Sequence, residues 1–228
     1  MAADPTLAAL TTKWFNESCR HRYSYNFTWL GLPIIQFPQD MVAMQELVWR
    51  VKPDLVVETG VARGGSLAFY ASLLELLRGD GRVVGIDIDI RPANREAIES
   101  HALAKRITLV DGSSTDERTV VRVRELARGR ERVLVVLDSN HTHDHVLREL
   151  ELYSPLVRAG SYVVVFDTVV ERMPAEAFPD RPWGPGNNPM TAVREFLARN
   201  DRFTVDEEIE NKLLITVAPR GYLRCVRD

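Results

Sequence analysis

The stretch LDSNHTHDHV, residues 137–146, places three histidines and two aspartates within ten residues, directly after an apolar run that is typical of a β-strand. Imidazole and carboxylate groups are the side chains that most often bind metal ions and move protons. The stretch therefore has two interpretations. It is either a zinc site that activates water for hydrolysis, or a group of polar residues at the end of a strand in an α/β sheet.

The zinc interpretation requires more residues than the chain supplies. The H-x-H-x-D-H cluster of metallo-β-lactamase-type hydrolases is one residue longer than HTHDH, because Asp144 directly follows His143. That site also needs histidine ligands further along the chain, and no histidine follows His145. The sequence therefore disfavours a zinc hydrolase.

The composition is that of an ordinary globular protein. The 228 residues are 45% hydrophobic and 27% charged, which suits one large domain. A net charge of −3 gives no electrostatic reason to expect nucleic acid, and no apolar run is long enough to span a membrane. The only cysteines, Cys19 and Cys225, form no CxxC pair, and the N-terminus lacks a signal-peptide pattern. We therefore predict a cytoplasmic protein.

From residue 54 onward, apolar runs alternate with patterns of helical spacing. Because the runs are continuous rather than alternating, the strands are expected to be buried on both faces of a parallel sheet. We predict one α/β domain over residues 1–228, in which a helical N-terminal cap (1–52) covers a Rossmann-like core (53–228). The five predicted parallel strands, each followed by a helix, are residues 54–58, 82–87, 106–111, 132–138 and 160–167. Ser114 or Thr115 is expected to be the N-cap of the helix after the third strand.

Two segments complete the predicted architecture. Residues 168–189 are rich in Pro and Gly and predict a lid loop. Residues 202–209 and 212–226 are predicted as two strands joined by a turn, which form an antiparallel edge. Aromatic and amide side chains of the cap and lid either contact an acceptor or pack internally: Tyr23, Tyr25, Trp29, Trp183 and the pair Asn187–Asn188.

Acidic residues end all five predicted parallel strands. Ligands bind beyond the carboxyl ends of strands in open sheets, so these side chains are expected to converge on one crevice. A single acid at a strand end is equally consistent with a solvated residue that begins a loop. Five clustered carboxylates repel one another unless a ligand or metal compensates them. The five are Glu58, Asp87, Asp111, Asp138 and Asp167.

The turn VVETGVARGGS, residues 56–66, joins the first strand to its helix. It is not the dinucleotide fingerprint, because Ala62 stands where the second glycine of G-x-G-x-x-G is required. It suits S-adenosylmethionine (SAM), whose carboxylate can bind backbone N–H groups at a helix N-terminus. Asp87 is placed to accept from ribose hydroxyls, and Arg63 either contacts an anion or is solvated. The predicted cofactor-binding residues are Glu58, Gly60, Ala62, Arg63, Gly64, Ser66, Asp87, Asp111, Gly112, Ser113 and Asp138.

Six segments together resemble one family: VVETGVARGGSLAFYASLLELL, VVGIDIDIRPANR, KRITLVDGSSTD, VLDSNHTHDHV, DRPWGPGNNP and IENKLLITVAPRGYL. They are similar to the CmcI-like "cephalosporin hydroxylase" family, which is related to rhamnosyl and macrolide-sugar O-methyltransferases. The resemblance implies a seven-stranded, mostly parallel methyltransferase sheet, SAM and a divalent metal as cofactors, and a homo-oligomer. It also implies methyl transfer to a hydroxyl of a small molecule, such as a deoxysugar or a glycosylated natural product.

Asp138 and Asp167 are predicted to hold Mg²⁺, because two carboxylates at neighbouring strand ends form a hard-oxygen site. By resemblance, the fifth strand of sugar O-methyltransferases supplies an acidic pair, and here Phe166 occupies the first position of that pair. The metal shell would then be completed by Asn140, a histidine or the substrate. His141 matches the general base by resemblance, and its alternative is a polar cap of the following helix.

The predicted chemistry explains why these groups are needed. A sugar hydroxyl is a weak nucleophile; a metal lowers its pKa, and a neutral imidazole removes its proton. His141 and Asp138 are therefore the predicted catalytic residues. His143 and His145 are expected on the following helix, either solvated or supporting the site, and Asp144 is expected to complement the helix dipole. Two alternatives stay open: a hydroxylase-type component of β-lactam-like antibiotic biosynthesis, and a SAM-binding protein without catalysis.

Overall fold

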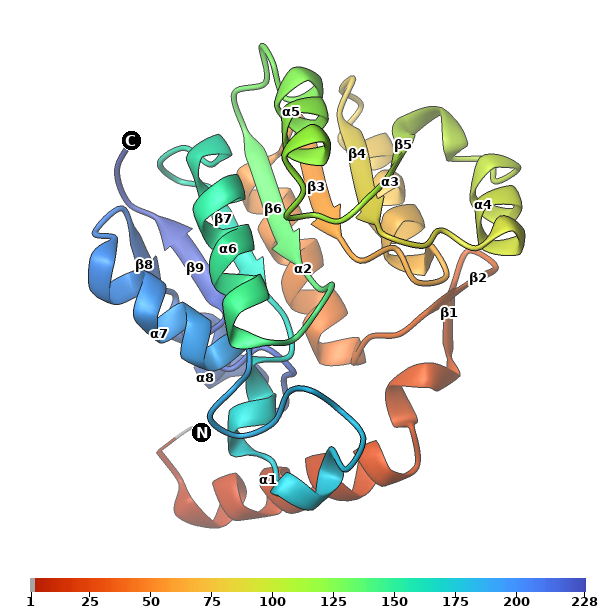
Figure 1. The fold of residues 1–228 in the computed structure, drawn as a ribbon. Coiled ribbons are helices and arrows are strands. Elements are labelled where there is room, and N and C mark those ends of the chain that lie inside the picture. Colours follow the sequence, from red (N-terminus) through yellow and green to blue (C-terminus); the bar gives the residue numbers. More distant parts are fainter. Residues whose placement is uncertain (1–2) are drawn as a thin grey trace.

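The computed structural model describes residues 3–228, and a seven-stranded sheet lies at its centre (Figure 1). The strand order is β5-β4-β3-β6-β7-β9-β8. The first five of these pair in parallel, whereas β9 is antiparallel to both β7 and β8. The predicted mostly parallel methyltransferase sheet is confirmed. Its strands are β3 (Leu55–Thr59), β4 (Arg82–Asp87), β5 (Ile107–Asp111), β6 (Val133–Leu137), β7 (Tyr162–Val165), β8 (Phe203–Val205) and β9 (Tyr222–Cys225).

Helices cover both faces of the sheet because its strands are apolar on both faces. One core joins α2, α3, α4 and α8 to one set of strand side chains, such as Val56 and Val136. The other core joins α5, α6 and α7 to the alternate set, such as Val57 and Val135. These helices are α2 (Pro38–Val51), α3 (Gly65–Leu76), α4 (Pro92–Glu99), α5 (Glu117–Leu126), α6 (His143–Tyr153), α7 (Pro189–Arg199) and α8 (Glu207–Leu213).

The N-terminal cap contains two helices with an aromatic segment between them. Helix α1 (Pro5–Arg20) is followed by the 3₁₀ turn Tyr23–Asn26 and by a small antiparallel hairpin of β1 (Phe27–Trp29) and β2 (Leu32–Ile34), which leads into α2. In Figure 1, α1 and the segment after β7 lie beyond the carboxyl ends of the parallel strands. The cap therefore covers the edge at which the acidic residues end their strands. None of the helices within residues 3–228 has both the length and the apolar character needed to cross a bilayer.

Two local predictions are wrong. The segment between the last two strands is not a simple turn, because Glu207–Leu213 forms α8 and the second strand begins only at Tyr222. Acidic residues in the first turn of α8 complement the helix dipole, and Ile209 is buried against the sheet. The N-cap of α5 is Asp116, whose carboxylate accepts from the Arg118 N–H, and not Ser114 or Thr115.

Candidate functional site

Asp138, His141 and Asp167 form a cluster at the carboxyl ends of β6 and β7. One potential ligand atom from each residue lies within 4.8 Å of the other two. His141 Nδ1 is 3.3 Å from Asp167 Oδ2, and its side chain is 18% exposed. Asp138 directly follows β6, whereas Asp167 adopts a left-handed conformation (φ 55°) two residues after β7. The neighbouring parallel strands thus bring together the predicted metal ligands and the predicted base.

Negative charge at this cluster is concentrated and poorly compensated. Burial raises the pKa of Asp138 well above its ordinary value, and the carboxylates of Asp167, Glu58, Glu149 and Asp40 raise it further, in that order. Like charges at this density favour either a proton or a bound cation. Carboxylate oxygens are the ligands that Mg²⁺ prefers. The donor set therefore fits a divalent cation, and its one histidine and two carboxylates differ from the two histidines and one carboxylate of non-haem iron oxygenases.

Neither Phe166, which stands in the place of an acid, nor Asn140, a candidate for completing the metal shell, offers a free oxygen. Phe166 is 2% exposed and packs in the core beside α2 and α3. The amide oxygen of Asn140 accepts from the Thr142 N–H at 2.9 Å and from the Thr142 hydroxyl at 2.8 Å.

One site residue was missed by sequence reasoning. Gln36 of the cap donates from Nε2 to Asp138 Oδ2 at 3.1 Å, across 102 positions of sequence. The one sequence feature that could have identified Gln36 is that it is a single amide within the apolar, proline-flanked stretch PIIQFP (33–38).

The glycine turn packs directly against the cluster of Asp138, His141 and Asp167. Gly60 has φ +89°, and a Cβ there would lie 2.0 Å from the Asp138 carbonyl oxygen, so only glycine fits without movement. Glu58 is 1% exposed; its Oε2 accepts from the Ser66 hydroxyl at 2.8 Å, and its Oε1 is buried without a hydrogen-bond partner among the described residues. Burial raises the pKa of Glu58 to about 8.

The remaining acids on the cofactor side have partners within the protein. Asp87 Oδ2 accepts from the backbone N–H groups of Val61 (2.8 Å) and Ala62 (3.3 Å), so this carboxylate fastens the glycine turn. Asp111 is held by Arg95, whose Nη2 lies 2.7 Å from each carboxylate oxygen. The remaining predicted residues lie in the same loops: Arg63 is exposed, Gly64 has φ +81°, Gly112 has φ +141°, and the Ser113 hydroxyl is 3.0 Å from that of Thr115.

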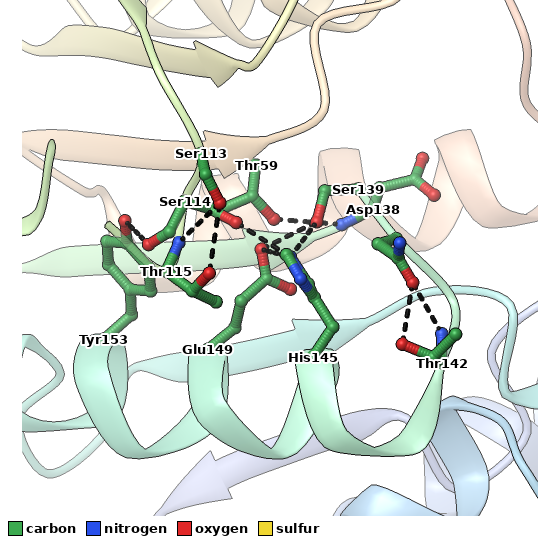
Figure 2. A network of polar contacts seen from close by, with 11 residues as sticks. Thr59, Ser113, Ser114, Thr115, Asp138, Ser139, Thr142, His145, Glu149 and Tyr153 are labelled. Atoms are coloured by element: carbon green, nitrogen blue, oxygen red, sulfur yellow. Dashed lines mark hydrogen bonds and ion pairs between the residues drawn. The ribbon is translucent and has the colours of Figure 1, made fainter.

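A buried polar network connects the loops after β5 and β6. Figure 2 shows His145, Glu149 and Tyr153 pointing from α6 towards both loops. His145 Nε2 lies 3.0 Å from the Ser114 hydroxyl and 3.2 Å from that of Ser139, and Ser139 donates to Glu149 at 2.7 Å. The Tyr153 hydroxyl donates to the Ser114 carbonyl at 2.6 Å. His145 therefore supports the loop that carries Asp138, and Asp144 lies in the first turn of α6.

The lid segment begins with the 3₁₀ turns Thr168–Arg172 and Ala175–Ala177 and then passes over His141. The Trp183 ring meets the His141 ring edge-on, with 4.9 Å between centroids. Glu171 anchors the loop by accepting from the Gly186 N–H at 2.8 Å.

The amides of the lid are used internally. Asn187 Oδ1 accepts from the His143 N–H at 2.9 Å, while the buried Asn188 is the N-cap of α7, so both support a structured turn. The His143 ring contacts Thr191 and Glu195 of α7. Among the aromatic residues of the cap, Tyr23 packs on Trp14, Phe27 and Phe37, Trp29 packs on Phe69, and Tyr25 is 57% exposed.

Comparisons with known proteins identify the family of this chain. Residues 21–226 match the family described as rhamnosyl O-methyltransferase/CmcI. A rhamnosyl O-methyltransferase of Mycobacterium leprae is 30% identical over 213 residues, which cover 89% of this chain and 87% of that protein. One from Mycobacterium tuberculosis (H37Rv) is 30% identical over 198 residues, covering 86% and 77%.

Solved structures share the fold. A CmcI structure described as a complex with Mg and SAM has a TM-score of 0.62 at 23% identity and covers 89% of this chain and 77% of that one. MycE, a methyltransferase from the mycinamycin biosynthetic pathway in complex with Mg, S-adenosylhomocysteine (SAH) and mycinamycin VI, has a TM-score of 0.54 at 18% identity, covering 99% of this chain and 56% of that one.

Proposed function

The chain belongs to the rhamnosyl O-methyltransferase/CmcI family of SAM-dependent O-methyltransferases, and from that premise we propose that it methylates a hydroxyl of a deoxysugar or glycosylated natural product. The observation that carries the proposal is the cluster of Asp138, His141 and Asp167 beside the glycine turn. A cation site, an imidazole and a cofactor loop at one sheet edge are the parts that methyl transfer to an unactivated hydroxyl needs.

Asp138 and Asp167 are the residues that would hold Mg²⁺. The cation, when bound, lowers the pKa of a coordinated alcohol and orients it. The surrounding carboxylates, which raise the pKa of Asp138, support a cation at this position. The buried network behind Ser139 and the close passage of Gly60 hold the Asp138 backbone in place.

His141 is the proposed general base. Its Nδ1 faces Asp167 Oδ2 at 3.3 Å, and a proton on Nδ1 leaves Nε2 free to accept the proton of the acceptor hydroxyl. The adjoining Trp183 ring, 4.9 Å away between centroids, restricts the rotation of the imidazole ring. The base is thus oriented by the protein before the acceptor binds.

The cofactor is proposed to lie along the glycine turn. Backbone N–H groups at the N-terminus of α3, near Gly64 and Ser66, are available for the SAM carboxylate. Glu58 has a buried oxygen without a partner, which suits a contact with the SAM ammonium group. Asp87, although it already binds the turn, lies where ribose hydroxyls are expected, and Asp111–Ser113 lie where adenine is expected.

The acceptor is proposed to enter between the cap and the lid. Trp183 presents an aromatic surface next to His141, which suits the apolar face of a deoxysugar. The names of the mycobacterial relatives support a deoxysugar, and the mycinamycin complex of MycE supports a glycosylated natural product. We also propose a homo-oligomer and a cytoplasmic location, the latter because both cysteines are free thiols.

A methyl-transfer assay tests the proposal. Purified protein is incubated with labelled SAM and a panel of rhamnosides and other deoxysugar glycosides, with Mg²⁺ or with EDTA. We expect Mg²⁺-dependent product, and we expect His141→Ala to lower kcat on the order of a hundredfold while SAH binding is unchanged. His21→Ala, at an exposed histidine after α1, is the matched control. SAH binding without methylation of any acceptor would instead support a binding protein without catalysis.

A further inference from the structure

Gln36 places a buried carboxamide beside the cluster of Asp138, His141 and Asp167. The residue is 8% exposed, its Nε2 lies 3.1 Å from Asp138 Oδ2, and its Oε1 is buried without a hydrogen-bond partner among residues 3–228. A buried amide oxygen without a partner costs free energy, and such groups in native structures require an explanation. The protein therefore fixes only one end of the carboxamide, through the bond from Nε2 to Asp138, and no hydrogen bond to Oε1 holds the amide in this orientation.

The chain holds Gln36 firmly in this position. The preceding strand β2 crosses the start of α3, where a Cβ on Gly65 would lie 2.3 Å from the Pro33 carbonyl oxygen. Ile34 and Phe37 on either side are each 2% exposed. One turn further, the buried Asp40 accepts from the Val217 N–H at 2.9 Å and from the Tyr222 hydroxyl at 2.7 Å. A side chain fixed in this way is suited to bind a ligand with defined geometry.

The charge around the cluster favours a neutral ligand in addition to the two aspartates. Asp138 and Asp167 balance the charge of a divalent cation, and Glu58, Glu149 and Asp40 already add negative potential at Asp138. A carboxylate or an amide oxygen can each supply a further hard donor, and the amide does so without adding to the negative charge at Asp138. Phe166 and Asn140 do not offer a free oxygen.

We propose that Gln36 Oε1 is a ligand of the divalent cation held by Asp138 and Asp167, in place of the carboxylate that Phe166 lacks. Rotation of the terminal amide by a half-turn exchanges Nε2 and Oε1 and leaves the rest of the side chain in place. Without a cation, Nε2 donates to Asp138; with a cation, Oε1 faces it. The inference rests on the proposed metal-assisted function and adds a ligand from the N-terminal cap.

Calorimetric titration with Mn²⁺ in the presence of saturating SAH tests the proposal. We expect Gln36→Leu to weaken Mn²⁺ binding about tenfold or more, and Gln36→Glu, which keeps an oxygen donor, to retain it. Gln45→Leu, further along α2, is the matched control and is expected to bind Mn²⁺ like the parent. SAH binding and thermal melting check that each variant is folded. Unchanged Mn²⁺ affinity in Gln36→Leu would overturn the proposal.

A crystal structure with Mn²⁺ separates a direct ligand from an indirect support. We expect Gln36 Oε1 to lie about 2.1 Å from the metal. A water molecule between the two, or Nε2 still facing Asp138, would overturn the proposal even if the affinity falls. If the parent binds no Mn²⁺ at all, this inference fails, and methyl transfer measured in EDTA then decides separately whether the O-methyltransferase function stands.

Discussion

Acidic side chains at the two halves of the sheet's carboxyl edge have different partners. At the ends of β4 and β5, Asp87 binds backbone N–H groups of the glycine turn and Asp111 pairs with Arg95. At the ends of β6 and β7, Asp138 and Asp167 lie beside His141 and other carboxylates. In the first half the protein itself supplies N–H groups or an arginine to each carboxylate. In the second half the carboxylates lack a compensating positive charge.

This difference separates acids that hold the loops of the scaffold in place from acids that need a cation. A carboxylate whose partners are N–H groups or arginines is stable as it stands. A buried carboxylate whose neighbours are other carboxylates is costly until a cation or proton arrives. In the sequence the two groups of acids look alike, because every parallel strand except β7 ends at an acid or one residue away from one. The partners, and not the positions, indicate which acids act in the chemistry.

The largest effect is expected at Asp138. Replacement with Asn keeps the shape but removes the charge that would hold the cation, so we expect kcat to fall about a thousandfold, because a metal contributes several kcal/mol to such a step. SAH binding should remain. Asp144→Asn, an exposed aspartate in the same stretch, should leave kcat unchanged. Steady-state kinetics with Mg²⁺ checks both, and an active Asp138→Asn enzyme would remove the distinction between the two halves.

The glycine turn contacts the Asp138 backbone at Gly60, and Gly60→Ala should be strongly destabilising. The added Cβ would lie 2.0 Å from the Asp138 carbonyl oxygen at φ +89°. The left-handed conformation and the clash together should lower the free energy of unfolding by about 3 kcal/mol. Gly129→Ala has a similar φ of +78° with nothing within 4 Å, and should lose only about 1 kcal/mol. Urea unfolding compares them, and equal losses would show that the close approach does not matter.

Glu58 should make the stability of the metal-free protein depend on pH. Burial raises its pKa from the ordinary 4.5 to about 8, so between these values the folded chain keeps a proton that the unfolded chain releases. The free energy of unfolding therefore falls as the pH rises through this window, by up to about 1.4 kcal/mol per pH unit.

Glu58→Gln cannot titrate, so its stability curve should be flatter in the same window, while Asp40, whose pKa burial raises to about 6, still contributes in both proteins. Urea unfolding of the parent and the variant across the window measures the difference. Parallel curves would mean that Glu58 stays ionised in the fold and is a further uncompensated carboxylate between the two halves.

The sheet could be predicted from the sequence because its signals are local. Each parallel strand is a continuous apolar run followed by a helix pattern, and the structure retains that order. The role of Gln36 could not be predicted, because it depends on how the cap folds back over β6 across 102 positions. The helix α8 was missed because residues 207–213 carry only two apolar side chains, Ile209 and Leu213, and lie between two strand-like runs. Their spacing of four residues is helical, and Ile209 is buried against the sheet.

The smallest effect is expected at Asp111, and it tests the division most directly. Its carboxylate is 65% exposed and pairs with Arg95, so Asp111→Asn should lower the free energy of unfolding by less than about 1 kcal/mol. If Asp111 belongs to the scaffold, SAH affinity should change by less than about fivefold. A much larger loss of SAH affinity at unchanged stability would show that the carboxylate contacts the cofactor. Partners within the protein would then no longer identify the acids that only build the scaffold.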